Sequence, residues 1–337
     1  MSEQIDIAVD LGAVPAPLPE IVSFRDFVVN PPTPPPQIIE GVLHQGCKMI
    51  LGGTSKSNKS WGLLDLAMSV ASGEKWWGRQ CTKLPVAYIN FELHTWSLAQ
   101  RMTALCAARP ECKGLGDYLH FWNLRGHNAD LSLLRPKLEE QLAKHQFGLL
   151  ILDPAYKVLG DRDENANGEI AGLMNELERL AQSSGAAVVV AHHFAKGDST
   201  NKSAMDRMSG AGAWARDPDS IVVLTPHEED NCFTVTSILR NLPQLPEFVL
   251  SWDFPLMKVA TDLNPEALRR PQAKNKVCTD KEFIEQMLTD KPASRSDVVA
   301  KAADLSISTA TTDRYLKRLS DAGLIASGGG FYWRNKA

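Results

Sequence analysis

The segment GTSKSNKS at residues 53–60 constrains the fold of this 337-residue chain more than any other. The apolar run KMILGG leads into it, and a segment with helical character starts at Lys59. A loop between a buried strand and a helix turns its backbone N–H groups inward, and the helix N-terminus adds positive potential. The spacing fits Gly-x4-Gly-Lys-Ser/Thr, which cradles phosphates. We therefore predict a nucleotide-binding loop made of Gly53, Thr54, Ser55, Lys56, Ser57, Asn58, Lys59, Ser60 and Trp61.

One residue of this loop departs from the motif. Asn58 stands where the second glycine is expected. Asn adopts left-handed backbone more readily than other non-glycine residues, so we expect binding to survive and hydrolysis to be the step that its bulk slows. Lys59 is expected to reach the β- and γ-phosphates of ATP, and the Ser60 hydroxyl to hold Mg²⁺. A chance Ser/Lys-rich loop is the alternative, which the strand–loop–helix context disfavours.

Two carboxylates follow apolar runs of the kind that form buried parallel strands. Asp153 ends the run at 147–153, and Glu92 ends the run at 86–92. Ligands bind beyond the carboxyl ends of such strands, so we predict Asp153 as a carboxylate of the Mg²⁺ site and Glu92 as the base that accepts a proton from water. The alternatives are an Asp that caps the following turn and a Glu that stabilises the next helix N-terminus.

Two histidines, His192 and His193, follow a third apolar run at residues 186–191. One of them is expected to donate to the γ-phosphate and to sense its loss. Paired histidines at this point also fit satisfied turn or core residues. They have no nearby cysteine or carboxylate at metal-binding spacing, so the pair is weak support for a metal site.

The order of the segments predicts the fold class. From residue 41 onward, short apolar runs alternate with longer helical segments, which favours an α/β fold with a mostly parallel sheet and helices on both faces. The later segments CFTVTSIL and FVLSWDF resemble antiparallel edge strands or a hairpin. We expect a Pro-rich N-terminal arm at 1–40, an ATPase domain at 41–262 and a polar linker at 263–277.

The last part of the chain, residues 278–337, shows a different pattern. Three short helices near 280–289, after Ser294 and at 308–322 precede the Gly-rich hairpin LIASGGGFYWR, which predicts a small winged helix-turn-helix domain. Residues 272–337 contain 7 Lys and 4 Arg against 6 Asp and 2 Glu, a net charge of +3 in a chain whose net charge is -4. Arg314, Lys317 and Arg318 lie on the third helix, the element that enters the major groove in such domains. A protein contact is the alternative use of this domain.

Composition adds only exclusions. No apolar run approaches the length that spans a bilayer, and the acidic N-terminus has no secretory pattern. The six cysteines show no CxxC spacing, so we expect a reduced, cytoplasmic protein without membrane attachment.

Taken with these residues, the chain resembles the RecA-like ATPases of the RepA hexameric-helicase family. The likeness covers about residues 38–255 and rests on the segments IIEGVLHQGCKMILGGTSKSNKS, YINFEL, LLILDP, VVVAHHFAKG and DRMSGAGAWARDPDSIVVL. It implies a RecA-like core, with ATP and Mg²⁺ as cofactors. It also implies the site roles, with Lys59 and Ser60 as ligands, Glu92 as base, Asp153 as metal carboxylate and His193 as sensor.

The same resemblance implies a homo-oligomer, most simply a hexameric ring. The family places an arginine at the subunit boundary, where it reaches the neighbour's γ-phosphate, and Arg240 in SILRNLP is the match. Lys196, Lys202, Arg207 and Arg216 lie in or beside the loop region that faces the channel in RecA-like rings. Such a basic, Gly-rich segment can track a nucleic-acid backbone, and a solvated loop is the alternative.

The sequence therefore predicts a Mg²⁺-dependent, ATP-hydrolysing P-loop ATPase that acts on DNA, as a RepA-like helicase or replication-associated motor of a mobile element or phage. The alternative is an ATP-gated DNA-binding regulator without helicase activity.

Overall fold

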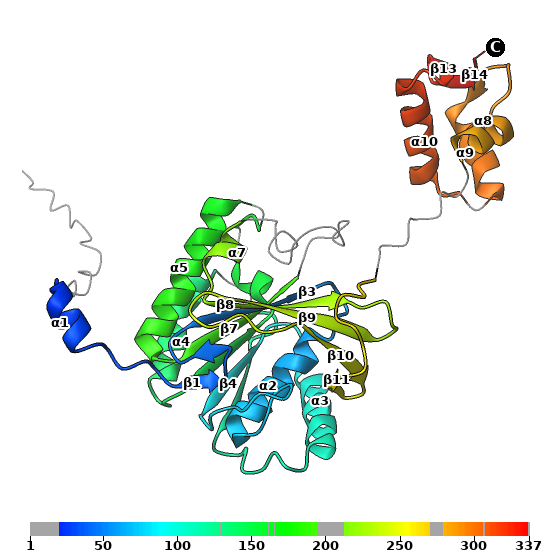
Figure 1. Cartoon of the computed structure of the whole chain (residues 1–337). Helices are drawn as coiled ribbons and strands as arrows, with labels where there is room; N and C mark the ends of the chain where they lie inside the picture. Colours follow the sequence, from blue (N-terminus) through cyan, green and yellow to red (C-terminus); the bar gives the residue numbers. More distant parts are fainter. Residues whose placement is uncertain are drawn as a thin grey trace, which may run out of the picture.

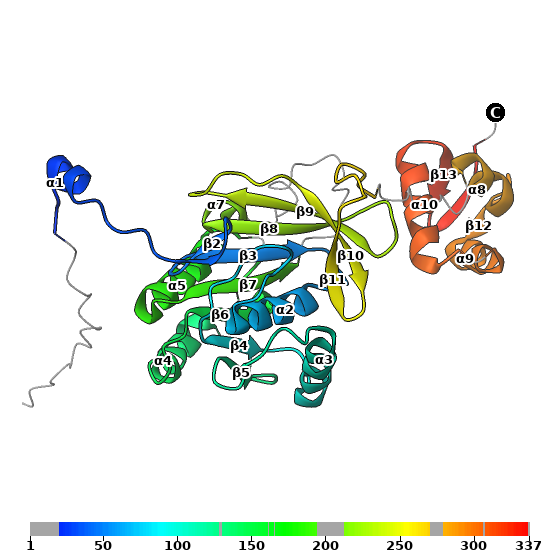
Figure 2. The ribbon, with the colours of Figure 1, turned by 60° about the horizontal axis from the view of Figure 1, so that its bottom comes forward.

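A nine-stranded sheet forms the body of the protein. The structure is a computed structural model, which describes residues 20–127, 130–160, 162–164, 166–193, 212–269, 279–305 and 307–335. Within them the strand order is β11-β10-β9-β8-β3-β7-β6-β4-β5 (Figures 1 and 2). The strands are β3 (Lys48–Gly53), β4 (Val86–Asn90), β5 (Leu119–Asn123), β6 (Leu149–Asp153), β7 (Ala187–His193), β8 (Ser220–Pro226), β9 (Cys232–Leu239), β10 (Phe248–Asp253) and β11 (Leu256–Ala260).

The pairing confirms the predicted mostly parallel sheet. All pairs from β8 through β3, β7, β6 and β4 to β5 are parallel. The pairs β8–β9, β9–β10 and β10–β11 are antiparallel, as expected for the late segments. Strand β3, which leads into the predicted nucleotide loop, is central between β7 and β8. This mixed sheet with its flanking helices fits the expected RecA-like core.

Helices cover both faces of the sheet (Figure 2). Helices α2 (Lys59–Ser72) and α3 (Thr95–Ala108) lie on one face. The other face carries α4 (Leu131–Leu142), α5 (Asn167–Ser184) and the short α7 (Ala213–Arg216), while a single turn, η1 (Ala155–Val158), follows β6. The helix predicted to start at Lys59 is thus confirmed.

Strand alternation divides the interior into two hydrophobic cores. Met49 and Leu51 of β3 face the core that includes α2, whereas Ile50 between them faces the core that includes α5. Successive side chains of a strand point to opposite faces, so a strand covered on both sides reads as a continuous apolar run. Each fully buried aliphatic side chain contributes about 1.5–3 kcal/mol, so both layers hold the strand ends in register.

Several elements do not appear as clear patterns in the sequence. Strand β5 is an edge strand whose residues are only half-buried, so it lacks an apolar run. Helix α4 contains Pro136, a residue that argues against a helix interior. The short strands β1 (Gln37–Ile39) and β2 (Leu43–His44) pair with each other, and Ile39 is fully buried.

Before β1, the chain forms the short helix α1 (Phe24–Val29), followed by a proline-rich stretch. Every described residue from 20 to 37 is exposed. The two views agree that α1 lies away from the sheet (Figures 1 and 2).

The C-terminal residues form a separate small core. Helices α8 (Asp280–Met287), α9 (Arg295–Asp304) and α10 (Thr309–Asp321) pack around Phe283, Leu316 and Leu319. Strands β12 (Ala293–Ser294), β14 (Phe331–Arg334) and β13 (Ile325–Gly328) form a three-stranded sheet in that order. The three helices and the terminal hairpin lie where the sequence predicted them, and their use as a winged helix-turn-helix stays a prediction. Across the described part of the chain, no helix has the length and apolar character to cross a bilayer.

Candidate functional site

Polar residues gather at the edge of the sheet where four parallel strands end. In the register of β3 with β7, Gly53 lies opposite His193. In the register of β4 with β6, Asn90 lies opposite Asp153, and Glu92 follows Asn90 by two residues. The carboxyl ends of parallel strands are where ligands bind in open α/β sheets. The parallel pairing therefore brings the sequence-predicted residues together.

A pocket of about 310 Å³ lies at this edge. It is lined by all five residues predicted from the sequence to act on the triphosphate from within the same chain: Lys59, Ser60, Glu92, Asp153 and His193. The other lining residues are Lys56, Ser57, Asn58, Trp61, Leu93 and Arg101. Of these, Arg101 had no signal in the sequence, because it belongs to no recognisable motif.

The loop backbone has the twisted form that exposes its amides. Lys56 has φ 67° and Asn58 has φ 56°, both in the left-handed region that non-glycine residues rarely adopt. Gly53 is required by close approach, since a Cβ there would lie 2.7 Å from Ser57 Oγ and 3.1 Å from the carbonyl oxygen of Leu224. Asn58 thus takes the backbone conformation expected of the missing glycine, and the loop forms in spite of the substitution.

Lys59 is held inside the loop and is only 4% exposed. Its Nζ donates to the carbonyl oxygens of Gly53 (3.0 Å) and Thr54 (2.8 Å) and to Ser57 Oγ (3.2 Å). Burial lowers the pKa of Lys59 to about 8, while the nearby Asp153 and Glu92 carboxylates act in the opposite direction. An anion that enters the loop would take over these hydrogen bonds and stabilise the charged ammonium.

Asp153 is fixed from the neighbouring strand. The buried Tyr88 hydroxyl donates to Asp153 Oδ2 at 2.6 Å, and burial, together with this carboxylate, raises the pKa of Tyr88 well above its usual value. The tyrosine therefore stays protonated and orients one carboxylate oxygen. Ser60 and Asp153 both line the pocket and offer oxygen ligands, the kind that Mg²⁺ prefers when phosphates and water complete its shell. The residues present fit a Mg²⁺–nucleotide complex.

Glu92 sits on a turn that Asn90 shapes. Asn90 Oδ1 accepts from the backbone N–H groups of Glu92 (3.3 Å) and Leu93 (2.9 Å), and Asn90 Nδ2 donates to the carbonyl oxygen of Leu93 (2.7 Å). The pKa of Tyr156 is raised by burial, by the charge of the Glu92 carboxylate and by a hydrogen bond to it. Glu92 is thus two residues beyond β4 rather than in it, on a turn that aims its carboxylate at the pocket.

The two histidines at the end of β7 have different surroundings. His193 lines the pocket, and burial and the charge of Lys59 lower its pKa. His192 turns to the other face, where it stacks on Trp214 of α7 with ring centroids 4.0 Å apart. Burial lowers the pKa of His192 to about 3, so its ring is neutral. Of the two, only His193 is placed to contact a bound phosphate.

An aromatic cluster borders the phosphate loop. The Trp61 ring lies 5.6 Å from that of Trp252 and 5.4 Å from that of Phe254, measured between centroids. The guanidinium of Arg101 lies over the Trp61 ring at 4.9 Å. Trp61 thus joins the loop to the β10–β11 hairpin.

Arg240 lies near the amino-terminal ends of the parallel strands, whereas the pocket lies at their carboxyl ends. It follows Leu239, which pairs with Ser220, and Ser220 is level with Met49 at the start of β3. Arg240 is exposed and donates to the carbonyl oxygen of Arg216. Because β3 runs from Met49 to Gly53 before it reaches the phosphate loop, Arg240 does not join the pocket of its own chain.

The predicted channel loop is only partly visible. Lys196, Lys202 and Arg207 lie outside the described residues. Arg216 ends α7, beside Arg240.

The fold and site define a class of protein, the P-loop ATPases. In that class a loop that carries a lysine joins a central strand to a helix, and a carboxylate ends a nearby strand of the same sheet. The sequence profile of a family described as "AAA domain" matches residues 14–199. The match spans more than half of the chain, so the chain belongs to the AAA domain family. The matched region starts at residue 14, within the Pro-rich N-terminal arm predicted at 1–40.

Comparison of structures finds likeness to a solved chain described as an "ATPase Domain". The TM-score is 0.47 and the sequence identity 12%, over 62% of this chain and 82% of that one. No curated protein sequence matches the chain.

Proposed function

We propose that the protein is a Mg²⁺-dependent ATP hydrolase that acts on DNA, a RepA-like helicase or replication-associated motor of a mobile element or phage. The observation that carries the proposal is the pocket that contains Lys59, Ser60, Glu92, Asp153 and His193 together. A structural loop would not need a base, a metal carboxylate and a phosphate sensor at the same edge of the sheet.

In this proposal each side chain has a role that its surroundings support. Lys59 exchanges its hydrogen bonds to the loop carbonyls for bonds to the β- and γ-phosphates. Ser60 and Asp153 hold Mg²⁺, which neutralises phosphate charge when it is bound. Glu92 accepts the proton of the attacking water, and His193 donates to the γ-phosphate and is released when that group leaves.

The remaining contact comes from a second subunit. Arg240 is exposed and lies at the far edge of its own sheet, so it is free to reach the site of a neighbour in a head-to-tail ring. A hexamer is the closed form that we propose. Arginines supplied in this way stabilise transition-state charge.

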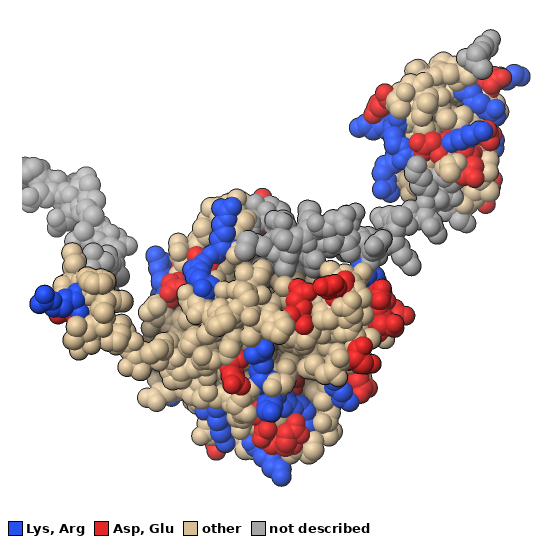
Figure 3. All heavy atoms as spheres, viewed as in Figure 1, with Lys and Arg blue, Asp and Glu red and all other residues tan. Residues whose placement is uncertain are grey.

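DNA contact is assigned to helix α10 of the C-terminal unit. Ala310, Arg314 and Lys317 are exposed at helical spacing along one side of α10, and Lys and Arg side chains gather on the α10 side of this unit (Figure 3). Of the three basic residues predicted from the sequence, Arg318 is engaged with Asp280 and lies over the Tyr315 ring. Arg314 and Lys317 are therefore the residues that we place against phosphates.

A second candidate function rests on Asn58, which has left-handed backbone where the motif has a glycine and so adds a side chain to the phosphate loop. If its bulk prevents hydrolysis, ATP binding alone would switch a DNA-binding regulator between two states.

DNA-stimulated turnover separates the two functions. The first predicts that single- or double-stranded DNA raises the ATPase rate, and that Glu92→Gln abolishes turnover while ATP still binds. The second predicts negligible turnover in the wild type and DNA affinity that changes with ATP. Normal hydrolysis by Glu92→Gln would show that Glu92 is not the base. Unchanged ATP affinity in Lys59→Ala would contradict the proposed nucleotide site.

A further inference from the structure

Lys48 is a buried lysine that the proposed mechanism does not use. It is the first residue of β3, the central strand that leads into the phosphate loop, and it is 6% exposed. Its Nζ bonds to two carboxylates, Asp217 just after α7 and Glu178 of α5, the latter at 2.9 Å. An ammonium is costly to bury without such partners, and replacing a buried ion pair by apolar residues is often neutral or stabilising. Stability alone therefore gives no reason for a lysine at this position.

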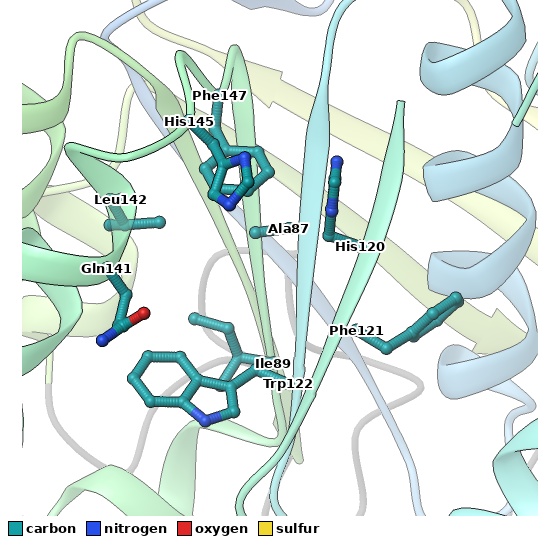
Figure 4. A pocket seen from close by; sticks show the side chains of 9 residues that line it. All are labelled: Ala87, Ile89, His120, Phe121, Trp122, Gln141, Leu142, His145 and Phe147. Carbon is teal, nitrogen blue, oxygen red and sulfur yellow. The ribbon is translucent and has the colours of Figure 1, made fainter. Parts of the chain in front are cut away.

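Lys48 lines neither the nucleotide pocket nor the groove between β5 and α4. The nucleotide pocket lies beyond the other end of β3. The groove has a volume of about 430 Å³, is lined by side chains such as Trp122, His145 and Phe147, and has no Lys, Arg, Asp or Glu in its lining (Figure 4). Binding of a ligand in either cavity therefore does not account for Lys48.

Lys48 holds the turn after α7 through both its side chain and its backbone. Its Nζ donates to Asp217, its backbone N–H donates to Asp219 Oδ2 at 2.9 Å, and the Asp219 N–H donates back to the Lys48 carbonyl oxygen at 3.1 Å. Burial acts to lower the pKa of Lys48, but the hydrogen bonds to Asp217 and Glu178 outweigh it, and the pKa is raised. Lys48 is therefore charged at neutral pH and keeps the turn at 216–219 against the first residue of β3.

The same turn holds Arg240, the arginine that we place in the neighbour's nucleotide site. The Arg240 guanidinium donates to the carbonyl oxygen of Arg216, and the Arg240 backbone N–H donates to the carbonyl oxygen of Asp219 at 2.9 Å. Burial acts to raise the pKa of the Glu178 carboxylate, but its hydrogen bonds and the charges of Lys48 and Arg240 hold that pKa below its usual value. Both the backbone and the side chain of Arg240 are thus fixed to a turn that Lys48 holds.

We propose that Lys48 is a positioning residue for Arg240, and that it acts through the turn at 216–219 on the nucleotide site of the neighbouring subunit. Strand β3 then serves two sites. Its last residues lead into the phosphate loop of its own chain, and its first residue sets the direction of the arginine that is given to the next chain. The inference rests on the proposed role of Arg240 and goes beyond it, since it assigns the group that holds this arginine in place.

The first test separates turnover from nucleotide binding. Lys48→Met removes the ammonium and keeps a side chain of similar length. Misplacement of a reacting group by about 1 Å can cost about 10²-fold in rate, so we expect a loss of that size in kcat. ATP affinity, measured by equilibrium binding, should stay unchanged because the phosphate loop is intact. Arg135→Met is the matched control, since Arg135 of α4 also pairs with a carboxylate of α5, Glu176, at 2.8 Å, and it should leave kcat unchanged.

Mixing with a second inactive variant shows which subunit Lys48 serves. Lys48→Met retains Glu92 in its own site, and Glu92→Gln retains both Lys48 and Arg240. A Glu92→Gln subunit should therefore complete the site of a Lys48→Met neighbour, and the ATPase rate of an equal mixture should rise to about a quarter of the wild-type rate per site. A defect of Lys48→Met in its own phosphate loop would not be repaired in this way.

Circular dichroism checks that the variants fold. If Lys48→Met does not fold, Asp217→Ala removes the same ion pair from the other side, at a side chain that is 36% exposed. It should show the same loss of kcat and the same recovery on mixing.

Three results would overturn the proposal. They are a wild-type kcat in Lys48→Met, weakened ATP binding as its main defect, and no recovery on mixing when mass spectrometry shows that subunits exchange. In each case a slow Arg240→Ala variant would leave the proposed shared site intact. A wild-type kcat in Arg240→Ala would instead contradict the shared site itself, and the role of Lys48 with it.

Discussion

The ammonium group of Lys59 has been removed from water, and this gives ATP binding a pH dependence. Burial lowers its pKa to about 8 in the unliganded protein, whereas the triphosphate needs the charged form. Affinity for ATP should therefore fall as pH rises through about 8, by at most about tenfold per pH unit. Titration calorimetry between pH 7 and 9.5 measures it, and Lys59→Arg is the control because a guanidinium stays charged. A flat wild-type profile would contradict the assignment.

The positions of the proposed site residues were predictable for a reason that does not extend to the residues that support them. Glu92, Asp153 and His193 each follow an apolar run, and parallel strands necessarily end at the same edge. Tyr88 and Arg101 reach the site from within a strand and from a helix face. Their positions depend on how elements pack, which one sequence does not specify. Strand alternation turns His192 and His193 to opposite faces, but which of the two faces the pocket depends on packing, and His192 stacks on Trp214.

At the scale of elements, the residue that joins the phosphate loop to α2 allows a prediction about the rate of hydrolysis. Asn58 precedes the helix in left-handed backbone, without a capping hydrogen bond from its side chain. Glycine adopts this conformation freely, so Asn58→Gly should keep the loop and remove side-chain bulk beside the phosphates. We expect kcat to rise a few-fold with little change in ATP affinity, measured by steady-state ATPase assay and equilibrium binding. Asn58→Ala is the control, because alanine is disfavoured at this φ. A kcat unchanged in Asn58→Gly would show that Asn58 does not limit hydrolysis.

Elements with a clear hydrophobic pattern in the sequence were predicted. Elements that are stabilised mainly by packing against neighbouring elements were not. Strands β3 and β6 are buried on both faces and read as apolar runs. Helix α4 forms in spite of Pro136, because Leu131, Leu138 and Leu142 are buried against the body. Tertiary burial outweighs local propensity there, and a single sequence shows only the propensity.

Helix α10 supports a prediction about salt. Arg314 and Lys317 are exposed on one side of it, and removing one phosphate-binding side chain should lower the slope of log affinity against log salt by about one. Arg314→Ala with Lys317→Ala should therefore weaken DNA binding and reduce the slope by about two. Fluorescence anisotropy at several salt concentrations measures it. Lys281→Ala with Lys301→Ala, exposed on α8 and α9, removes the same charge and should have a smaller effect. Equal effects of the two pairs would assign binding to net charge rather than to α10.

At the scale of the whole molecule, the sheet separates the two halves of the proposed site. The pocket lies beyond the end of β3, and Arg240 lies level with its start. Glu92 and Arg240 therefore act on the same nucleotide only if they belong to different chains. A monomer would contain both groups and still lack a complete site.

This separation predicts that two inactive variants restore each other. Glu92→Gln lacks the base, and Arg240→Ala lacks the arginine, whose loss should cost about 10³–10⁵-fold in kcat. In a mixed ring, an Arg240→Ala subunit supplies an intact Glu92 to a site that the Arg240 of its Glu92→Gln neighbour completes. Random mixing at equal amounts makes about a quarter of the interfaces complete, so the ATPase rate should recover to about a quarter of the wild-type rate per site. The double variant mixed with wild type is the control for subunit exchange. Activity that stays at the level of the separate variants, with exchange demonstrated, would place Arg240 outside the neighbour's site.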